Sequence, residues 1–228
     1  MSALVLVVNA DDLGYDPEID RGILEAHRRG IVTSASAMVE TSFAAAALAA
    51  APASLGLGLH AVLDPGLSQA EAEAEVRRQM GLFERLRGAP PTHLDSHRHA
   101  HAAPAVLAGV AAVALECGLP VRAIDPAMRA ALRAAGVRTA DHFLGDAALR
   151  PCWTAERLLS ALAALPEGTT ELMCHPGHAP SSVRTSFGAE REAELAALCD
   201  PRAREAVAAR GARLARFGEP APGAGKAT

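Results

Sequence analysis

The stretch Leu4-Val5-Leu6-Val7-Val8-Asn9-Ala10-Asp11-Asp12 holds the strongest fold signal in the chain. Its first five residues are leucine and valine without alternation, which is typical of a strand buried on both faces of a parallel sheet. Two carboxylates, Asp11 and Asp12, follow directly. Adjacent side chains diverge at a strand end, so the two carboxylates can serve different tasks. The stretch therefore predicts a buried strand that ends in a polar site.

Strand and helix patterns alternate about seven times along the chain. The predicted strands are residues 4–8, 31–39, 55–60, 93–99, 121–124, 139–144 and 169–174. The predicted helices are residues 17–29, 42–51, 68–86, 104–117, 126–135, 154–165, 190–198 and 201–210. This alternation predicts an α/β fold with parallel strands and surrounding helices. A (β/α) barrel is favoured over a doubly wound open sheet, because no G-x-G-x-x-G turn follows the first strand.

Composition limits the class of protein. The 228 residues predict one domain over residues 1–217, followed by a disordered Pro-, Gly- and Ala-rich tail at 218–228. The net charge of −4 is spread without a basic run, so we expect a small neutral or polar substrate and no nucleic acid. No apolar stretch approaches the roughly 20 residues that span a membrane, and the four cysteines lack C-x-x-C spacing. We therefore expect a cytoplasmic protein with reduced thiols.

The stretch from His93 to His101 holds four of the nine histidines and one aspartate, Asp95. In an extended strand every second side chain shares a face, so His93, Asp95, His97 and His99 would form one wall. His101 would join it if the strand continued. Neutral imidazole is the commonest metal ligand, which favours a metal site over a solvated histidine-rich loop. The strand argument does not choose among the four histidines.

Other polar residues also follow predicted strands. His60 ends the strand at 55–60, and His175 follows the strand at 169–174, with His178 three residues later. The ends of barrel strands converge on one face, which is where barrel active sites lie. Taken alone, His60 would more often be a core histidine, whereas the accumulation of strand-end residues favours a shared site. His178 is equally compatible with the site and with the surface.

Five ordered motifs resemble those of the YdjC-like carbohydrate deacetylases, which include chitooligosaccharide deacetylases. They are Val8-Asn9-Ala10-Asp11-Asp12-Leu13-Gly14, residues 22–34, Gly58-Leu59-His60, Thr92-His93-Leu94-Asp95-Ser96-His97 and Met173-Cys174-His175-Pro176. The resemblance implies a distorted or incomplete (β/α) barrel that holds one divalent metal ion, Mg²⁺ or Zn²⁺, and removes acetyl groups from N-acetylated sugars. The 32 residues between His60 and His93 are fewer than is common in the family.

The resemblance also implies roles for individual residues. It places the metal ion on Asp12, His60 and His97 and makes Asp11 the catalytic base. His175 is then the candidate general acid, which protonates the leaving amine.

The remaining polar residues of the motifs are expected around these ligands and catalytic groups. The residues expected to contact the substrate or to support the ligands are Asp95, His99, His101, Arg122 and His178. Arg122 would hold Asp11 ionised.

Two other functions stay open at this point. A metal-dependent phosphoesterase could use a similar barrel, but the first strand ends in Asp-Asp and not in the expected H-x-H. A non-catalytic sugar-binding protein with a vestigial site is the second alternative, and the complete set of acid, base and ligands argues against it. A homodimer is compatible with the sequence.

Overall fold

The computed structural model describes residues 4–145 and 149–219. Within these residues the strands form one sheet in the order β4-β3-β2-β1-β6-β5, and β7 also pairs with β1. All pairings are parallel. The strands are β1 (Leu4–Leu13), β2 (Ser34–Ala37), β3 (Gly56–Ala61), β4 (Leu94–Ser96), β5 (His142–Leu144), β6 (Gly168–Cys174) and β7 (Arg213–Leu214).

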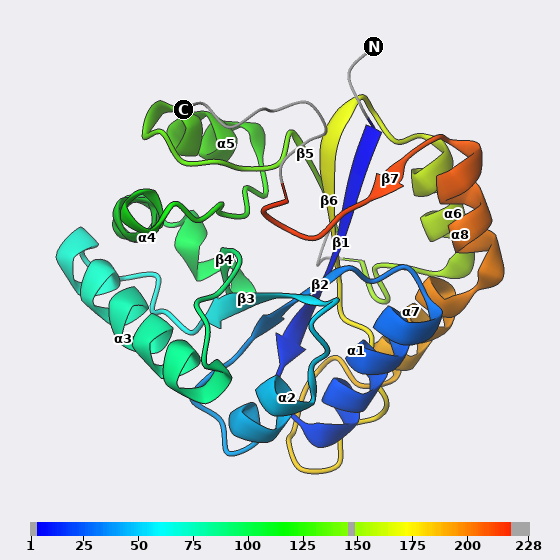
Figure 1. Cartoon of the computed structure of the whole chain (residues 1–228), viewed down its shortest axis with the longest axis horizontal. Helices are drawn as coiled ribbons and strands as arrows, with labels where there is room; N and C mark the ends of the chain where they lie inside the picture. Colours follow the sequence, from blue (N-terminus) through cyan, green and yellow to red (C-terminus); the bar gives the residue numbers. More distant parts are fainter. Residues whose placement is uncertain (1–3, 146–148, 220–228) are drawn as a thin grey trace.

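Helices surround the sheet in Figure 1, with α3 and α4 on one side and α1, α6, α7 and α8 on the other. Their bounds are α1 (Pro17–Arg29), α2 (Ala44–Ala50), α3 (Gln69–Arg87), α4 (Pro104–Cys117), α5 (Pro126–Ala134), α6 (Ala155–Ala163), α7 (Ala189–Cys199) and α8 (Pro201–Ala209), and a 3₁₀ segment covers His97–Ala102. The curved parallel sheet inside this helical layer is a half-barrel, so the predicted incomplete (β/α) barrel is confirmed.

Strand β1 is the centre of the sheet. It pairs with β6 from Leu4 to Ala10, with β2 toward its carboxyl end and with β7 near its start. Its residues from Val5 to Leu13 are all buried, as the unbroken apolar run predicts. The register with β2 shifts between Ala10 and Leu13, so Asp11 and Asp12 lie in an irregular segment of the strand.

The helix ends follow the capping rules. The Asp16 side chain accepts a hydrogen bond from the backbone N–H of Glu18 at the start of α1, and Pro17 occupies the first turn. Ser68 and Glu71 form a capping box at the start of α3, and Gly88 ends this helix in the left-handed conformation that glycine adopts without strain. These boundaries agree with the sequence pattern to within a few residues.

Several strands are shorter than the sequence predicts. β4 stops at Ser96, because Arg98 and His99 turn into the left-handed region with φ of 55° and 54°. The predicted strand at 121–124 is reduced to one bridge between Leu94 and Val121. The two-residue strand β7 was not predicted.

The predicted disordered tail begins inside the described residues. Arg216 donates hydrogen bonds to Glu219 from its backbone N–H and from Nε, the latter at 2.6 Å. Gly218 packs against the Thr92 carbonyl closely enough that an added Cβ would lie 2.9 Å from this oxygen. Residues 220–228 of the predicted tail lie outside the described residues.

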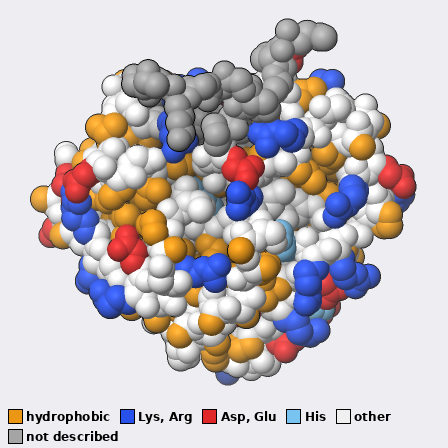
Figure 2. Space-filling model, viewed as in Figure 1, with side chains coloured by type: hydrophobic (Ala, Val, Ile, Leu, Met, Phe, Trp, Pro, Cys, Tyr) orange, Lys and Arg blue, Asp and Glu red, His pale blue; other side chains and the backbone are white. Residues whose placement is uncertain are grey.

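The surface is mixed in character. Figure 2 shows acidic and basic side chains interspersed with apolar ones over the face seen in Figure 1. Among the described helices, none combines the length and the apolar character needed to cross a membrane. None of the four cysteines forms a disulfide bond; Cys152 and Cys174 are buried, whereas Cys117 is exposed at the end of α4.

Candidate metal centre and catalytic site

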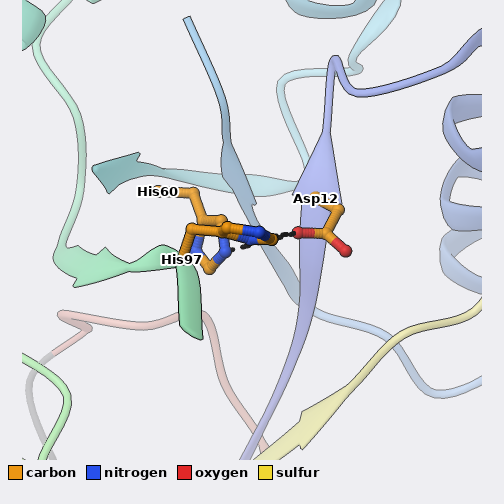
Figure 3. A group of neighbouring side chains, drawn as sticks. All are labelled: Asp12, His60 and His97. Carbon is orange, nitrogen blue, oxygen red and sulfur yellow. Dashed lines mark ion pairs between the residues drawn. The ribbon is translucent and has the colours of Figure 1, made fainter. Parts of the chain in front are cut away.

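Three side chains from separate strands meet at one point (Figure 3). Asp12 comes from β1, His60 from β3 and His97 from the residue after β4. Asp12 Oδ1 lies 3.3 Å from His60 Nε2 and 3.3 Å from His97 Nδ1. The three ligand atoms lie within 4.8 Å of one another, so they could hold one metal ion. These are the three residues that the family resemblance assigned to the metal.

The chemistry of this cluster fits a metal ion. Asp12 Oδ1 is buried and lacks a hydrogen-bond partner of good geometry, although two imidazole nitrogens point toward it. A buried carboxylate oxygen without a donor is costly, and a cation between the three atoms would satisfy it. Burial alone would raise the pKa of Asp12, but contacts with His60 and His97 and the charge of Arg191 hold that pKa well below its usual value. Asp12 is therefore ionised, as a metal ligand must be.

Asp95 fixes the orientation of His60. Its Oδ1 lies 2.7 Å from His60 Nδ1, and both side chains are buried. With a proton on Nδ1 donated to Asp95, His60 Nε2 presents its lone pair toward Asp12 and His97, which is the usual support for a metal-binding histidine. Burial would lower the pKa of His60, but Asp95, Asp11 and Asp12 raise it to about 10. The same negative surroundings attract a divalent cation.

Asp11 is held by hydrogen-bond donors on both of its carboxylate oxygens. Both of its oxygens accept hydrogen bonds of 2.7 Å from Arg122, and Asn9 Nδ2 donates to Oδ1 at 2.9 Å. Burial would raise the pKa of Asp11, but Arg122 more than compensates and the pKa is lowered. The two adjacent aspartates thus face different partners, as their position at a strand end predicts.

Arg122 is fully buried and contacts three carboxylates. Besides Asp11 it contacts Asp95 at 2.9 Å and Glu171 at 2.7 Å. Desolvation would lower its pKa, but the three acids raise that pKa well above the ordinary value. Burial raises the pKa of Glu171 to about 7. The expectation that Arg122 keeps Asp11 ionised therefore agrees with the geometry.

A second group, Asp11, His60 and Asp95, also brings three ligand atoms together. We do not assign a metal ion to this group, because the Arg122 guanidinium contacts both carboxylates and balances their negative charge. A cation placed there would be repelled by a fixed positive charge. The cluster of Asp12, His60 and His97 remains the metal-site candidate among the described residues.

His175 lies across from Asp11. Its Nε2 is 4.0 Å from Asp11 Oδ2, and its ring packs against Phe187 with centroids 5.2 Å apart. His175, Asp11 and Phe187 line a cavity of about 470 Å³ together with the three metal-site candidates. The cavity wall also includes Tyr15, Arg98, His99, Arg150, Cys152, Met173, Arg184, Thr185, Ser186 and Arg191. A base candidate and an acid candidate therefore flank one space beside the metal cluster.

The remaining histidines of the 93–101 stretch do not form the expected wall. His93 is buried and stacked on Phe217, with ring centroids 4.3 Å apart, and it does not line the cavity beside the metal cluster. His101 is buried, and its ring nitrogens contact the Ser96 hydroxyl and the Arg122 carbonyl. His99 lines the cavity, with its pKa lowered to about 4 by burial. The left-handed turn after His97, and not strand alternation, decides the directions of His99 and His101.

His178 lies outside this cavity. Its Nε2 is 3.2 Å from Glu25 Oε2 on α1, and its backbone N–H donates to the Glu18 carbonyl. Glu171 and Arg191 contact residues of the site and are not among the residues expected from the sequence. A signal existed for both, because Glu171 interrupts a buried strand and Arg191 falls on the apolar face of α7, four residues before Leu195.

The fold and the site together define a class: a half-barrel of parallel strands that carries, where its strands end, an Asp-His-His cluster able to hold a metal ion, with Asp11 and His175 beside it. A family model described as YdjC-like protein matches residues 5–209, and the chain belongs to this family.

Two curated relatives and one solved structure resemble the chain over nearly its full length. The chain is 35% identical to a carbohydrate deacetylase of Geobacillus stearothermophilus, over 93% of the chain and 96% of the relative. It is 34% identical to a chitooligosaccharide deacetylase of Enterobacter sp. (strain 638), over 93% and 98%. The structure of an Enterococcus faecalis V583 protein described as a cellobiose-phosphate cleavage protein superposes with a TM-score of 0.85 at 27% identity, over 94% of this chain and 98% of that one.

Proposed function

We propose that the chain is a metal-dependent hydrolase that removes acetyl groups from N-acetylated sugars or oligosaccharides. The observation that carries the proposal is the meeting of Asp12, His60 and His97 beside a cavity that also contains Asp11 and His175. The names of the curated relatives, carbohydrate deacetylase and chitooligosaccharide deacetylase, support the substrate class.

The donor set favours a particular kind of metal. Two imidazole nitrogens and one carboxylate suit Zn²⁺ or another first-row transition metal, whereas Mg²⁺ prefers oxygen ligands. Three protein ligands leave positions open, which is typical of catalytic and not of structural zinc sites. Of the two metals expected from the sequence, we therefore propose Zn²⁺.

The residues divide the work of amide hydrolysis. A divalent metal ion held by Asp12, His60 and His97 would polarise the acetyl carbonyl and make a water more acidic. Asp11, kept ionised by Arg122, accepts a proton from the attacking water. His175, which lines the same cavity, donates a proton to the sugar nitrogen, since an amine leaves poorly unless it is protonated. The 4.0 Å between the two catalytic groups fits attack and departure at one carbon.

Acetate release tests the proposal. The protein would be stripped with a chelator, reloaded with Zn²⁺, Co²⁺ or Mg²⁺, and assayed for acetate on N-acetylated mono- and oligosaccharides and for phosphate on phosphoesters. We expect acetate from at least one saccharide, no phosphate, and loss of activity in Asp12→Ala and His97→Ala. Phosphate release would favour a phosphoesterase, and binding without release would favour a sugar-binding protein.

Three finer expectations belong with this proposal. We propose that the partner is a small saccharide and not a nucleic acid, that residues 1–217 act as one domain, and that the protein is cytoplasmic. A homodimer stays a prediction of the sequence, and light scattering at several protein concentrations would check it.

A further inference from the structure

We propose that Arg191 is a positioning residue that holds Asp12 as a one-oxygen metal ligand. This inference rests on the metal site of the proposed function. It assigns a role to an arginine on α7 that lies 179 positions from Asp12 in the sequence.

The two oxygens of Asp12 have separate partners. Oδ1 faces His60 and His97, at 3.3 Å from each nitrogen. Oδ2 accepts a hydrogen bond of 2.6 Å from Arg191 Nη2. The carboxylate is thus bound on one side by an arginine and open on the other toward the two histidines. A metal ion between the histidines would meet Oδ1 only.

Arg191 is itself fixed in place. Its Nε donates to the Phe187 carbonyl at 3.0 Å, and its side chain is 2% exposed. Gly177 packs against it so closely that an added Cβ would lie 3.1 Å from Arg191 Cδ. The backbone N–H of Gly177 also donates to the Arg191 carbonyl. The guanidinium is therefore held against Asp12 by contacts on its other side.

Asp12 needs such a partner, because its backbone is in the left-handed region with φ of 73°. Non-glycine residues adopt this conformation at a cost and only where the surroundings enforce it. Among the described residues, Arg191 donates the only hydrogen bond with good geometry to the Asp12 carboxylate. Without it, the carboxylate could rotate and offer both oxygens or neither.

The charge of Arg191 supports a positioning role over simple attraction of the metal ion. A buried cation beside a cation site opposes metal binding by repulsion. The presence of Arg191 is explained if orienting Asp12 favours metal binding by more than this repulsion opposes it. One-oxygen ligation also keeps more coordination positions free for water and substrate, as an open catalytic site requires.

A double-mutant cycle on Zn²⁺ binding tests the proposal. The metal-free parent, Arg191→Met, Asp12→Ala and the double variant would be titrated with Zn²⁺ against a chromophoric chelator. Loss of a residue that orients a ligand typically weakens metal binding about 10–100-fold, so we expect this loss for Arg191→Met. In the Asp12→Ala background, Arg191→Met should weaken binding no further, because Arg191 acts through Asp12.

Two further variants serve as controls for the loss of Zn²⁺ affinity. Arg191→Lys keeps a charged donor and should lose less affinity than Arg191→Met. Arg204→Met removes an arginine that donates to the Gly30 carbonyl, far from the cluster, and should bind Zn²⁺ like the parent. Circular dichroism of each metal-free variant reports whether it is folded.

The outcomes separate this inference from the proposed function. Parental affinity in Arg191→Met, or losses that add in the double variant, would overturn the role of Arg191. Coupled losses without acetate release from any saccharide would support that role and contradict the deacetylase. A parent protein that binds no Zn²⁺ would overturn both.

Discussion

Replacement of Arg122 by methionine is expected to destabilise the protein severely at neutral pH. Arg122 is the buried cation shared by Asp11, Asp95 and Glu171, which lie 2.7 to 2.9 Å from its nitrogens. Breaking one buried ion pair by removing a single partner costs about 3–5 kcal/mol, and here three carboxylates lose their partner. The whole free energy of unfolding of a domain is about 5–15 kcal/mol. We therefore expect Arg122→Met to lose at least about 3–5 kcal/mol at pH 7.

The loss should depend on pH with a definite sign. The pKa of Glu171 is raised by burial to about 7 even with Arg122 present, and it would rise further without the guanidinium. A carboxyl whose pKa is higher in the folded state binds more protons when folded, so its contribution to stability falls as pH rises between the unfolded and folded pKa values. The deficit of Arg122→Met relative to the parent should therefore be smallest near pH 5 and largest near pH 8.

Urea unfolding followed by circular dichroism at pH 5, 7 and 8 measures this deficit. Arg77→Met is the matched control, because it removes an arginine that makes a two-point ion pair with Glu116 on the exposed surface, and little change is expected. Arg122→Lys, which keeps the charge but not the planar fork, should fall between parent and Arg122→Met. A loss below about 1 kcal/mol at pH 7, or a deficit independent of pH, would refute the reasoning.

Four other predictions concern single positions. Asp11→Asn should keep bound Zn²⁺ by equilibrium dialysis while acetate release falls about 10²–10⁴-fold, because an amide cannot accept the proton; near-native turnover would contradict this. His175→Ala should show a similar loss on an N-acetyl sugar but little loss on an activated acetyl ester, and equal losses on both would argue against an acid role. The pKa of Asp20 is raised to about 7 by burial, so its contribution to stability falls as pH rises from about 4 to 7. Asp20→Asn should therefore have a higher free energy of unfolding than the parent, and urea unfolding should show this advantage growing between pH 5 and 8 to at most about 4 kcal/mol. Gly58→Ala would put a Cβ 2.3 Å from His93 Nε2 and should lower stability by about 1–3 kcal/mol in thermal unfolding.

Local signals in the sequence predicted most of the fold. The start of β1, the Asp16-Pro17 start of α1 and the Ser68 capping box depend on nearby residues and agree with the structure, although β1 continues beyond its predicted end at Val8 to Leu13. The two-residue strand β7 carries no such pattern, because it is defined only by its pairing with β1. Strand lengths were overestimated where tertiary contacts, and not propensity, end the strand.

The site was predictable to a different extent. The convergence of Asp12, His60 and His97 follows from their place at the ends of strands in one parallel sheet, although the choice of His97 came from the family resemblance. Alternation failed for His99 and His101, because the chain turns into left-handed backbone directly after His97. No rule based on strand periodicity anticipates such a turn.

The partner of Asp12 was missed for another reason. Arg191 lies far along the chain, and an ion pair across such a separation leaves no local pattern. Its position on the apolar face of α7 was the available signal, since a charged residue on a buried face needs a partner.

The pairing of β1 with β6 and β7 affects how the protein folds during its synthesis. A ribosome releases the first strand, with Asp11 and Asp12, long before it releases the strands that flank it along residues 4–10. The two aspartates must also await Arg122 and Arg191, which are 111 and 179 positions away. Contacts of such long range make folding slow. During translation the part of the first strand that pairs with β6 and β7 therefore lacks these neighbours until synthesis is nearly complete, and its apolar residues can associate with other chains.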